Sequence, residues 1–207
     1  MPGSAELVEV LAGPVLDAAP RLLGAVLRYA EVAVRLTEVE AYDGPGDPGS
    51  HAARGRTPRN AVMFGPPGRL YVYFTYGMHH CVNVVCGPEG TASAVLFRAG
   101  EVVHGHESAR ARRPAARRDR DLARGPGRLC QALALDRGQD GTDLADGPVT
   151  LTLLAEPVDT QAISRGPRVG LRHAAQRPWR FWLTGDASVS SYRPASRSGV
   201  DGSRAPR

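Results

Sequence analysis

The stretch VAVRLTEVEAY (residues 32–42) predicts a β-strand that carries two carboxylates where an apolar face should continue. Strict alternation places six side chains on one face, namely Val32, Val34, Leu36, Glu38, Glu40 and Tyr42. Three hydrophobic residues followed by two acids predict a core face that runs into a cavity. The next segment, DGPGDPGSHAARGR (43–56), is rich in glycine and proline and predicts a loop beside that cavity.

The rest of the chain predicts an α+β fold. Three β-rich runs follow one another through short connections that contain glycine, which predicts an antiparallel meander; they are LYVYFTY (70–76), CVNVVC (81–86) and ASAVLFR (92–98). Further strands are expected at 149–154 and 180–185, and helices at 14–27 and within 125–135. Strands that follow strands, with helices beside them, predict a single domain with a curved, mostly antiparallel β-sheet over residues 1–192. Residues 193–207 have the composition of a disordered tail.

Composition limits the class of protein. The 207 residues are 42% hydrophobic, and no apolar run approaches the roughly 20 residues that span a membrane. The N-terminus lacks the basic flank and apolar stretch of a secretory signal, and three cysteines cannot all pair within the chain. A cytoplasmic protein is therefore expected. The cysteine and histidine spacings predict no metal site, and the lack of a glycine-rich nucleotide motif predicts no cofactor.

The positive charge is concentrated in one segment. The chain carries a formal net charge of +5, and residues 107–128 alone contain eight arginines against three acidic residues, which is also +5. Such a cluster predicts a phosphate-rich partner, and a solvated loop is the alternative. The chain has no lysine, which excludes enzymes that need a lysine Schiff base or a P-loop lysine.

Five motifs in order resemble the alkyladenine (3-methyladenine) DNA glycosylase family, over residues 11–192 apart from the arginine-rich segment. They are TEVEAY, SHAARGRTPRN, LYVYFTYGMHHCVNV, LFRAGE and GPGRLCQALALD. The resemblance implies a bacterial base-excision repair enzyme, associated with the nucleoid, whose partner is damaged double-stranded DNA. Such an enzyme flips an alkylated or deaminated purine out of the duplex, hydrolyses its N-glycosidic bond and leaves an abasic site. We expect a monomer.

The resemblance also implies the catalytic residues. Glu40, the acid of EAY, matches the general base that activates a water. Arg98, which the pattern places at the end of the third β-run, matches a residue that holds this water and favours the ionised carboxylate. A backbone carbonyl near RVG is used as well, and Val169 is its candidate.

The same resemblance assigns a base-binding pocket. Tyr42, His51 and Tyr73 match the residues that sandwich the flipped base, and Asn83 matches the amide that disfavours the 2-amino group of guanine. Tyr76 matches the tyrosine that fills the gap left in the duplex. Two features depart from this pattern or lack a role in it, namely His79, where some relatives carry an aromatic residue, and Glu38.

Alternative functions remain open from the sequence. The lack of lysine predicts water attack and a monofunctional glycosylase, although a Pro2 amine exposed by removal of Met1 could support lyase chemistry. A non-catalytic module could bind nucleic acid through the arginine cluster. A glycoside hydrolase could use Glu38 and Glu40, but same-face neighbours lie on one side of a substrate, roughly 6.6–7 Å apart, which suits that chemistry poorly.

Overall fold

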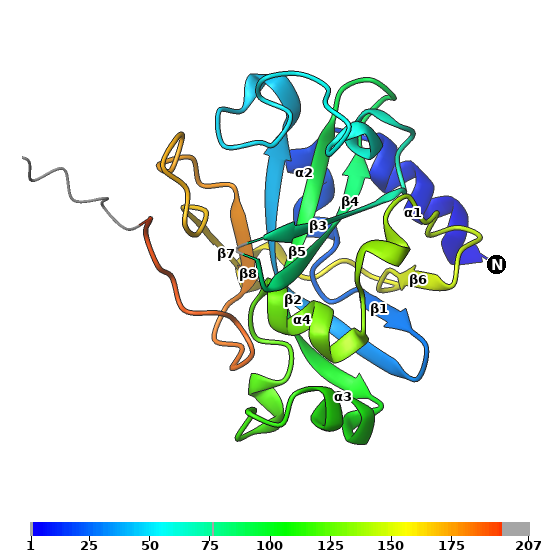
Figure 1. Cartoon of the computed structure of the whole chain (residues 1–207), viewed down its shortest axis with the longest axis vertical. Helices are drawn as coiled ribbons and strands as arrows, with labels where there is room; N and C mark the ends of the chain where they lie inside the picture. Colours follow the sequence, from blue (N-terminus) through cyan, green and yellow to red (C-terminus); the bar gives the residue numbers. More distant parts are fainter. Residues whose placement is uncertain (1, 76, 196–207) are drawn as a thin grey trace, which may run out of the picture.

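The computed structural model describes residues 2–75 and 77–195, with side chains from residue 5 onward, and β2 (Val32–Asp43) is the strand around which they are arranged (Figure 1). β2 pairs with β1 (Val26–Tyr29), with β5 (Ser93–His104) and with β8 (Arg180–Leu183). It therefore contacts strands from both ends of the chain, and its side chains meet residues that are distant in sequence.

One antiparallel sheet contains all the described strands. Six strands lie in the order β3-β4-β5-β2-β1-β6, where β3 is Leu70–Thr75, β4 is His79–Cys86 and β6 is Val149–Thr152. β7 (Ile163–Gly166) joins this sheet through β8. Every pairing among the described residues is antiparallel, so the predicted meander β3-β4-β5 and the α+β class are confirmed.

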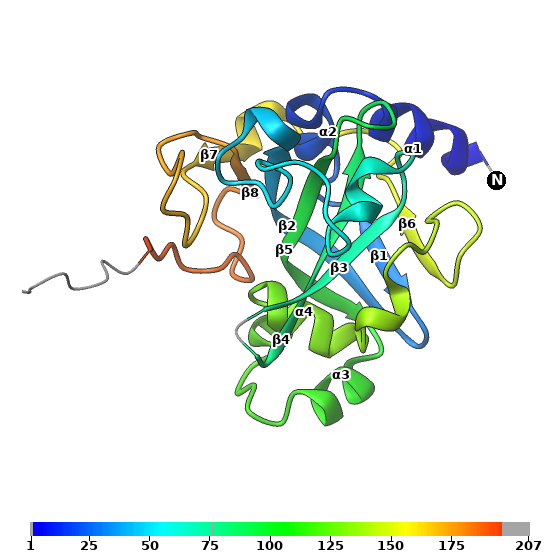
Figure 2. The ribbon, with the colours of Figure 1, turned by 45° about the horizontal axis from the view of Figure 1, so that its top comes forward.

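The helices lie at two ends of the sheet. α1 (Pro2–Ala12) and α2 (Val15–Arg21) lie together at one end, and α3 (His106–Arg112) lies beside α4 (Pro126–Leu133) at the other. Figure 2 shows α4 packed along β4 with α3 beyond it. The predicted helix over residues 14–27 is too long, because the chain turns at Gly24 with a φ of 81° and enters β1. Gly24 and Ala25 instead bond to Leu36 of β2.

Two β-bulges change which face of β2 is apolar. Thr37 is an extra residue on β2, and Arg98 is an extra residue on β5, since Leu36, Glu38 and Val39 pair with Gly100, Ala99 and Phe97. The core face therefore passes from Leu36 to Val39 and Ala41, all fully buried in the main core. The prediction of one continuous face from Val32 to Tyr42 is wrong: Glu38, Glu40 and Tyr42 point away from the core.

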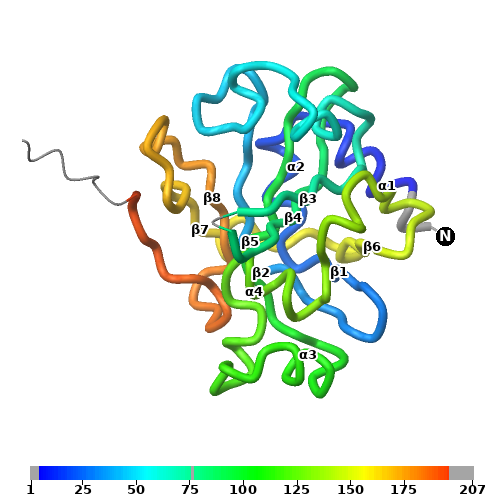
Figure 3. The backbone as a smooth tube through the Cα atoms, viewed as in Figure 1, coloured from blue at the N-terminus to red at the C-terminus, as the bar shows by residue number. Residues whose placement is uncertain are grey.

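The last described segment runs along β2. Figure 3 shows residues 180–195, orange to red, on the side of the molecule where β7 and β8 lie. The bulged Thr37 hydroxyl is 2.8 Å from the Ser188 hydroxyl, and Arg35 pairs with Asp186 at 2.8 Å. Residues 193–195 belong to the described part of the predicted tail, where the Arg193 carbonyl accepts a bond from Gly170, and residues 196–207 lie outside it.

Candidate active site

The register of the sheet places four side chains in one row across four strands. Tyr71 of β3 is opposite Asn83 of β4, Asn83 is opposite Leu96 of β5, and Leu96 is opposite Glu40 of β2. Directly paired residues share a face of a sheet, so this row forms a floor. All four residues line a cavity of about 860 Å³, which is within the usual range for small-molecule sites.

Glu40 is fully buried at this floor and is surrounded by donors. Its Oε1 accepts the backbone N–H of Val169 at 2.7 Å, and its Oε2 accepts the Tyr42 hydroxyl at 2.8 Å. Arg98 Nε lies 3.5 Å from Oε1. Burial, with the nearby Glu40 charge, raises the pKa of Tyr42 well above its usual value, so this hydroxyl keeps its proton and acts as a donor.

Arg98 connects Glu40 to Glu38. Its Nε lies 2.8 Å from Glu38 Oε1, and Glu38 itself is fully buried. Burial opposes the charge of Arg98, but the Glu40 and Glu38 carboxylates outweigh it and raise the pKa of the guanidinium. The sequence suggested that Arg98 is the last residue of its strand, but β5 continues to His104. The bulge at Arg98 turns its side chain into the cavity.

Glu38 does not line the cavity. It accepts bonds from Arg180 Nε at 2.6 Å, from the Ser190 hydroxyl at 3.0 Å and from the Ser190 backbone N–H at 2.7 Å. A carboxylate occupied in this way cannot flank a substrate. The two-carboxylate glycoside hydrolase considered from the sequence is therefore disfavoured.

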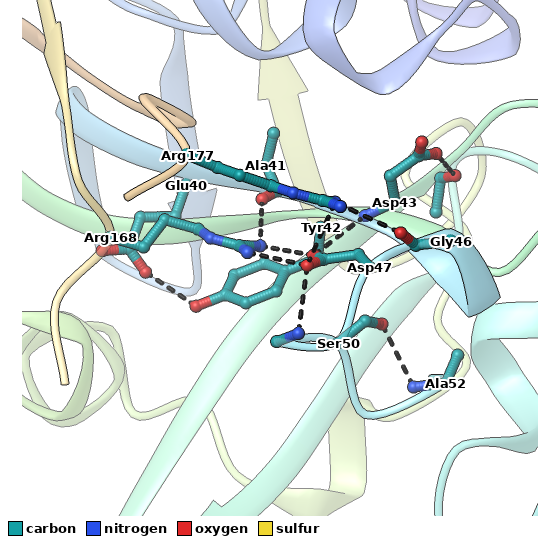
Figure 4. Close-up of polar contacts among 12 residues, drawn as sticks. Glu40, Ala41, Tyr42, Asp43, Gly46, Asp47, Ser50, Ala52, Arg168 and Arg177 are labelled. Atoms are coloured by element: carbon teal, nitrogen blue, oxygen red, sulfur yellow. Dashed lines mark hydrogen bonds and ion pairs between the residues drawn. The ribbon is translucent and has the colours of Figure 1, made fainter. Parts of the chain in front are cut away.

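A buried arginine, Arg168, packs against the ring of Tyr42. Arg168 donates to the Ala41 carbonyl at 2.9 Å. It also forms a bidentate ion pair with Asp47, one bond of which is 2.7 Å long. Its guanidinium lies 4.6 Å from the centroid of the Tyr42 ring and 5.1 Å from that of Trp179. Figure 4 shows Arg168 beside the Tyr42 ring and reaching Asp47, with the Tyr42 hydroxyl on Glu40. The loop after β2 is thereby tied to the segment that supplies Val169.

Aromatic side chains form one wall of the cavity. The rings of His51 and Tyr73 meet edge to face at 4.5 Å, and Tyr73 stacks on Tyr71 at 5.4 Å. His51 Nδ1 is 3.1 Å from the Tyr71 hydroxyl. Although His51 is open to the cavity, the packing around its ring and then the nearby Arg59 cation lower its pKa, which favours the neutral imidazole. Asn83 donates its amide N–H to the Tyr71 carbonyl at 3.0 Å, which fixes the orientation of the amide.

The cavity brings together the seven residues that the resemblance assigns to catalysis and base binding, and His79 lines it as well. The seven are Glu40, Tyr42, His51, Tyr73, Asn83, Arg98 and Val169. Tyr76 lies outside the described residues. The sequence interpretation missed Tyr71, which could have been found because it lies two residues before Tyr73 on the same strand face. It also missed Arg168, for which position next to Val169 was the only signal.

Another part of the cavity lining comes from the arginine-rich segment. Arg113, Arg117 and Arg128 line the cavity together with Gly125 and Gly127 at the start of α4. Arg113 is held in place, since it donates to the Leu122 carbonyl at 3.2 Å and to Gln131 at 2.7 Å. Burial and then the Arg128 charge lower the pKa of Arg113, which indicates that like charges are gathered here. Other arginines of the segment pair elsewhere, as Arg110 does with Asp119 at 2.6 Å.

Residues 2–75 and 77–195 contain no group of three or more His, Cys, Asp or Glu side chains that could hold a metal ion. Within the same ranges, no helix combines the length and the hydropathy needed to cross a bilayer.

Comparison with known proteins places the chain in a family. Residues 9–187 match the family model described as methylpurine-DNA glycosylase (MPG). A protein from Streptomyces avermitilis is 58% identical over 193 residues, which cover 89% of this chain and 90% of the relative. A protein from Nocardia farcinica is 56% identical over 207 residues, which cover 97% and 98%. Both carry the name "Putative 3-methyladenine DNA glycosylase". The chain therefore belongs to the methylpurine-DNA glycosylase family.

Proposed function

We propose that this DNA glycosylase takes a damaged purine out of duplex DNA and hydrolyses its N-glycosidic bond with a water that Glu40 activates. The main support for this proposal is the position of Glu40, which is fully buried on the floor of the cavity and accepts a hydrogen bond on each oxygen. As the C1′–N bond breaks, the water oxygen bonds to C1′ and its proton passes to Glu40. A purine alkylated at N3 or N7 is cationic and departs as a neutral base with the electron pair of the broken bond, so one positioned carboxylate suffices for this step. Arg98 and the Val169 backbone carbonyl are proposed to hold the water.

The pocket walls suit a purine that has left the base stack. We propose that the base stacks against Tyr42 on one face and against Tyr73 and His51 on the other, with a contribution of roughly 1–3 kcal/mol per stacked base. Neutral His51 adds no like charge against a cationic alkylated base. Asn83 is proposed to disfavour guanine, because its fixed amide occupies space that the 2-amino group would need. Tyr76 is proposed to fill the gap in the duplex.

The absence of lysine supports a monofunctional enzyme. Lyase chemistry needs an amine that forms a Schiff base with the sugar, whereas water attack leaves an intact abasic strand. We therefore propose that the DNA backbone stays uncut until alkali is added. We further propose that the protein acts as a nucleoid-associated monomer in the cytoplasm.

The test is excision from labelled duplexes that each carry one lesion: hypoxanthine, 3-methyladenine, 7-methylguanine or ethenoadenine. We expect strand cleavage after alkaline treatment for at least one lesion, and none before it. Cleavage without alkali would contradict the monofunctional mechanism. Tight binding to the lesion duplexes without any abasic product would instead support the non-catalytic binding module.

A further inference from the structure

We propose that Glu38 is a positioning residue for base excision: it holds Arg98 away from Glu40, so that Glu40 stays free to accept a proton from water. This inference rests on the function proposed above. It gives a role to Glu38, to which the sequence assigned no catalytic role.

Glu38 acts through other residues because both its oxygens are occupied. Oε1 accepts bonds from Arg180 and the Ser190 hydroxyl and lies 2.8 Å from Arg98 Nε, and Oε2 accepts the Ser190 backbone N–H. The residue is fully buried and does not line the cavity. Arg98 lines the cavity and contacts Glu38, so it connects Glu38 to the site of the reaction.

Arg98 is shared unequally between the two acids. Its Nε is 2.8 Å from Glu38 but 3.5 Å from Glu40, and both contacts are ion pairs, since the Nε–H of Arg98 is directed at neither oxygen. A guanidinium in direct contact with Glu40 would form a charge-assisted bond to Oε1 and make the carboxylate a weaker base. By taking the close contact, Glu38 keeps Arg98 near enough to stabilise the charge of Glu40 without occupying it.

The charges of this buried cluster are balanced. Glu38 and Glu40 face Arg98 and Arg180, and none of these residues is more than 9% exposed. Removal of the Glu38 charge leaves two guanidiniums with one carboxylate in the cluster. A buried charge without its partner is costly, so Arg98 is expected to close on Glu40.

The experiment uses Glu38→Gln in the full chain, with single-turnover excision of hypoxanthine from duplex DNA measured across pH. We expect the rate to fall about tenfold or more, since a general base contributes roughly 100- to 10,000-fold. The acid limb of the pH–rate profile is expected to move to lower pH, because the carboxylate has become a weaker base. The Kd for lesion DNA is expected to change less than about twofold, since the stacking residues are untouched.

A structural defect alone would lower the rate without moving the acid limb. Loss of the Glu38 charge also acts through space, but in the double variant described below the lost Arg180 charge offsets this effect, so a shift that persists there reports contact between Arg98 and Glu40. The other titratable and charged groups around Glu40 remain in the variant; they are Arg98, Tyr42, Tyr73 and Cys81. Burial raises the pKa of the Tyr73 hydroxyl and of the Cys81 thiol, so both stay neutral on the acid side.

A charge-balanced variant guards against misfolding. Arg180 does not line the cavity, and its removal leaves both carboxylates charged, so Arg180→Gln alone is expected to lower the Tm without moving the acid limb to lower pH. The double variant Glu38→Gln/Arg180→Gln restores the balance and is expected to regain stability but not rate. The inference is overturned if folded Glu38→Gln or the double variant keeps the wild-type rate and acid limb, or if Arg180→Gln shows the same defect. A wild-type protein that releases no base would refute the proposed function instead.

Discussion

At the residue scale, Glu40 receives its three neighbours from three different parts of the chain. Tyr42 comes from the same strand two residues later, Arg98 from a bulge on β5, and Val169 from the segment between β7 and β8. The Tyr42 contact can be removed by deletion of a single heavy atom, the hydroxyl oxygen. It therefore offers a test of how far donors to the carboxylate control the reaction.

We expect Tyr42→Phe to lower the single-turnover rate roughly tenfold or more, because the hydroxyl fixes the orientation of the Glu40 carboxylate and misplacement of a catalytic group can cost about 100-fold. The ring is kept, so the Kd for lesion DNA should stay close to that of the wild type. Because the lost donor favoured the carboxylate, the acid limb of the pH–rate profile should move to higher pH, opposite to the shift expected for Glu38→Gln. An unchanged limb would show that the Tyr42 hydroxyl does not act on Glu40 during the reaction.

At the scale of elements, the Asp47–Arg168 pair joins the loop after β2 to the segment after β7. Both side chains are fully buried. Breaking such a pair by removing one partner typically costs about 3–5 kcal/mol. We expect Asp47→Asn to lower the free energy of unfolding in urea by about this amount. The matched control is Arg177→Ala, whose more exposed guanidinium lies 3.7 Å from Asp47 and should contribute less than about 1 kcal/mol.

The same pair predicts a pH dependence of stability. Burial opposes the Asp47 charge, but the bonds from Arg168 and from the Gly49 backbone outweigh it and lower the pKa of Asp47 below its usual 3.8. A carboxyl whose folded pKa is depressed stabilises the protein above the unfolded pKa and loses this contribution as pH falls. The decline in unfolding free energy from about pH 5 to pH 3 should therefore be shallower in Asp47→Asn. An equally steep decline would assign it to other carboxyls.

Much of the element pattern could be predicted from the sequence, but the bulges could not. The meander was visible because apolar alternation and glycine connections are local signals. Thr37 and Arg98 carry no such signal, because a bulge depends on how two strands pair. The predicted helix over 14–27 was too long because the apolar residues at its end suit either a helix or a strand. Pairing with β2 makes residues 26–29 a strand. Glu38 could not be explained, since Arg180 and Ser190 are more than 140 residues away.

At the scale of the whole molecule, the arginine-rich segment divides into two groups. Some arginines form ion pairs away from the cavity, whereas Arg113, Arg117 and Arg128 line it. A DNA strand that delivers a base to this cavity brings its phosphates along. These three residues are thus the ones expected to contact the backbone.

We expect Arg128→Gln to weaken binding to lesion and undamaged duplexes alike, and to reduce the slope of log K against log salt by about 0.9 for each lost phosphate contact. Arg110→Gln is the matched control, because it removes the same charge from an exposed side chain paired with Asp119. Binding titrations at several salt concentrations measure both. Equal effects of the two substitutions would show that the segment acts only through its overall charge.

The most direct test of the central claim is single-turnover excision by Glu40→Gln on a duplex that carries hypoxanthine, with the Kd measured in parallel. Glutamine keeps the size of the side chain but cannot take a proton from water. We expect a protein that folds and binds lesion DNA about as tightly as the wild type, yet forms no detectable abasic site. Excision at the wild-type rate by folded Glu40→Gln would contradict this claim.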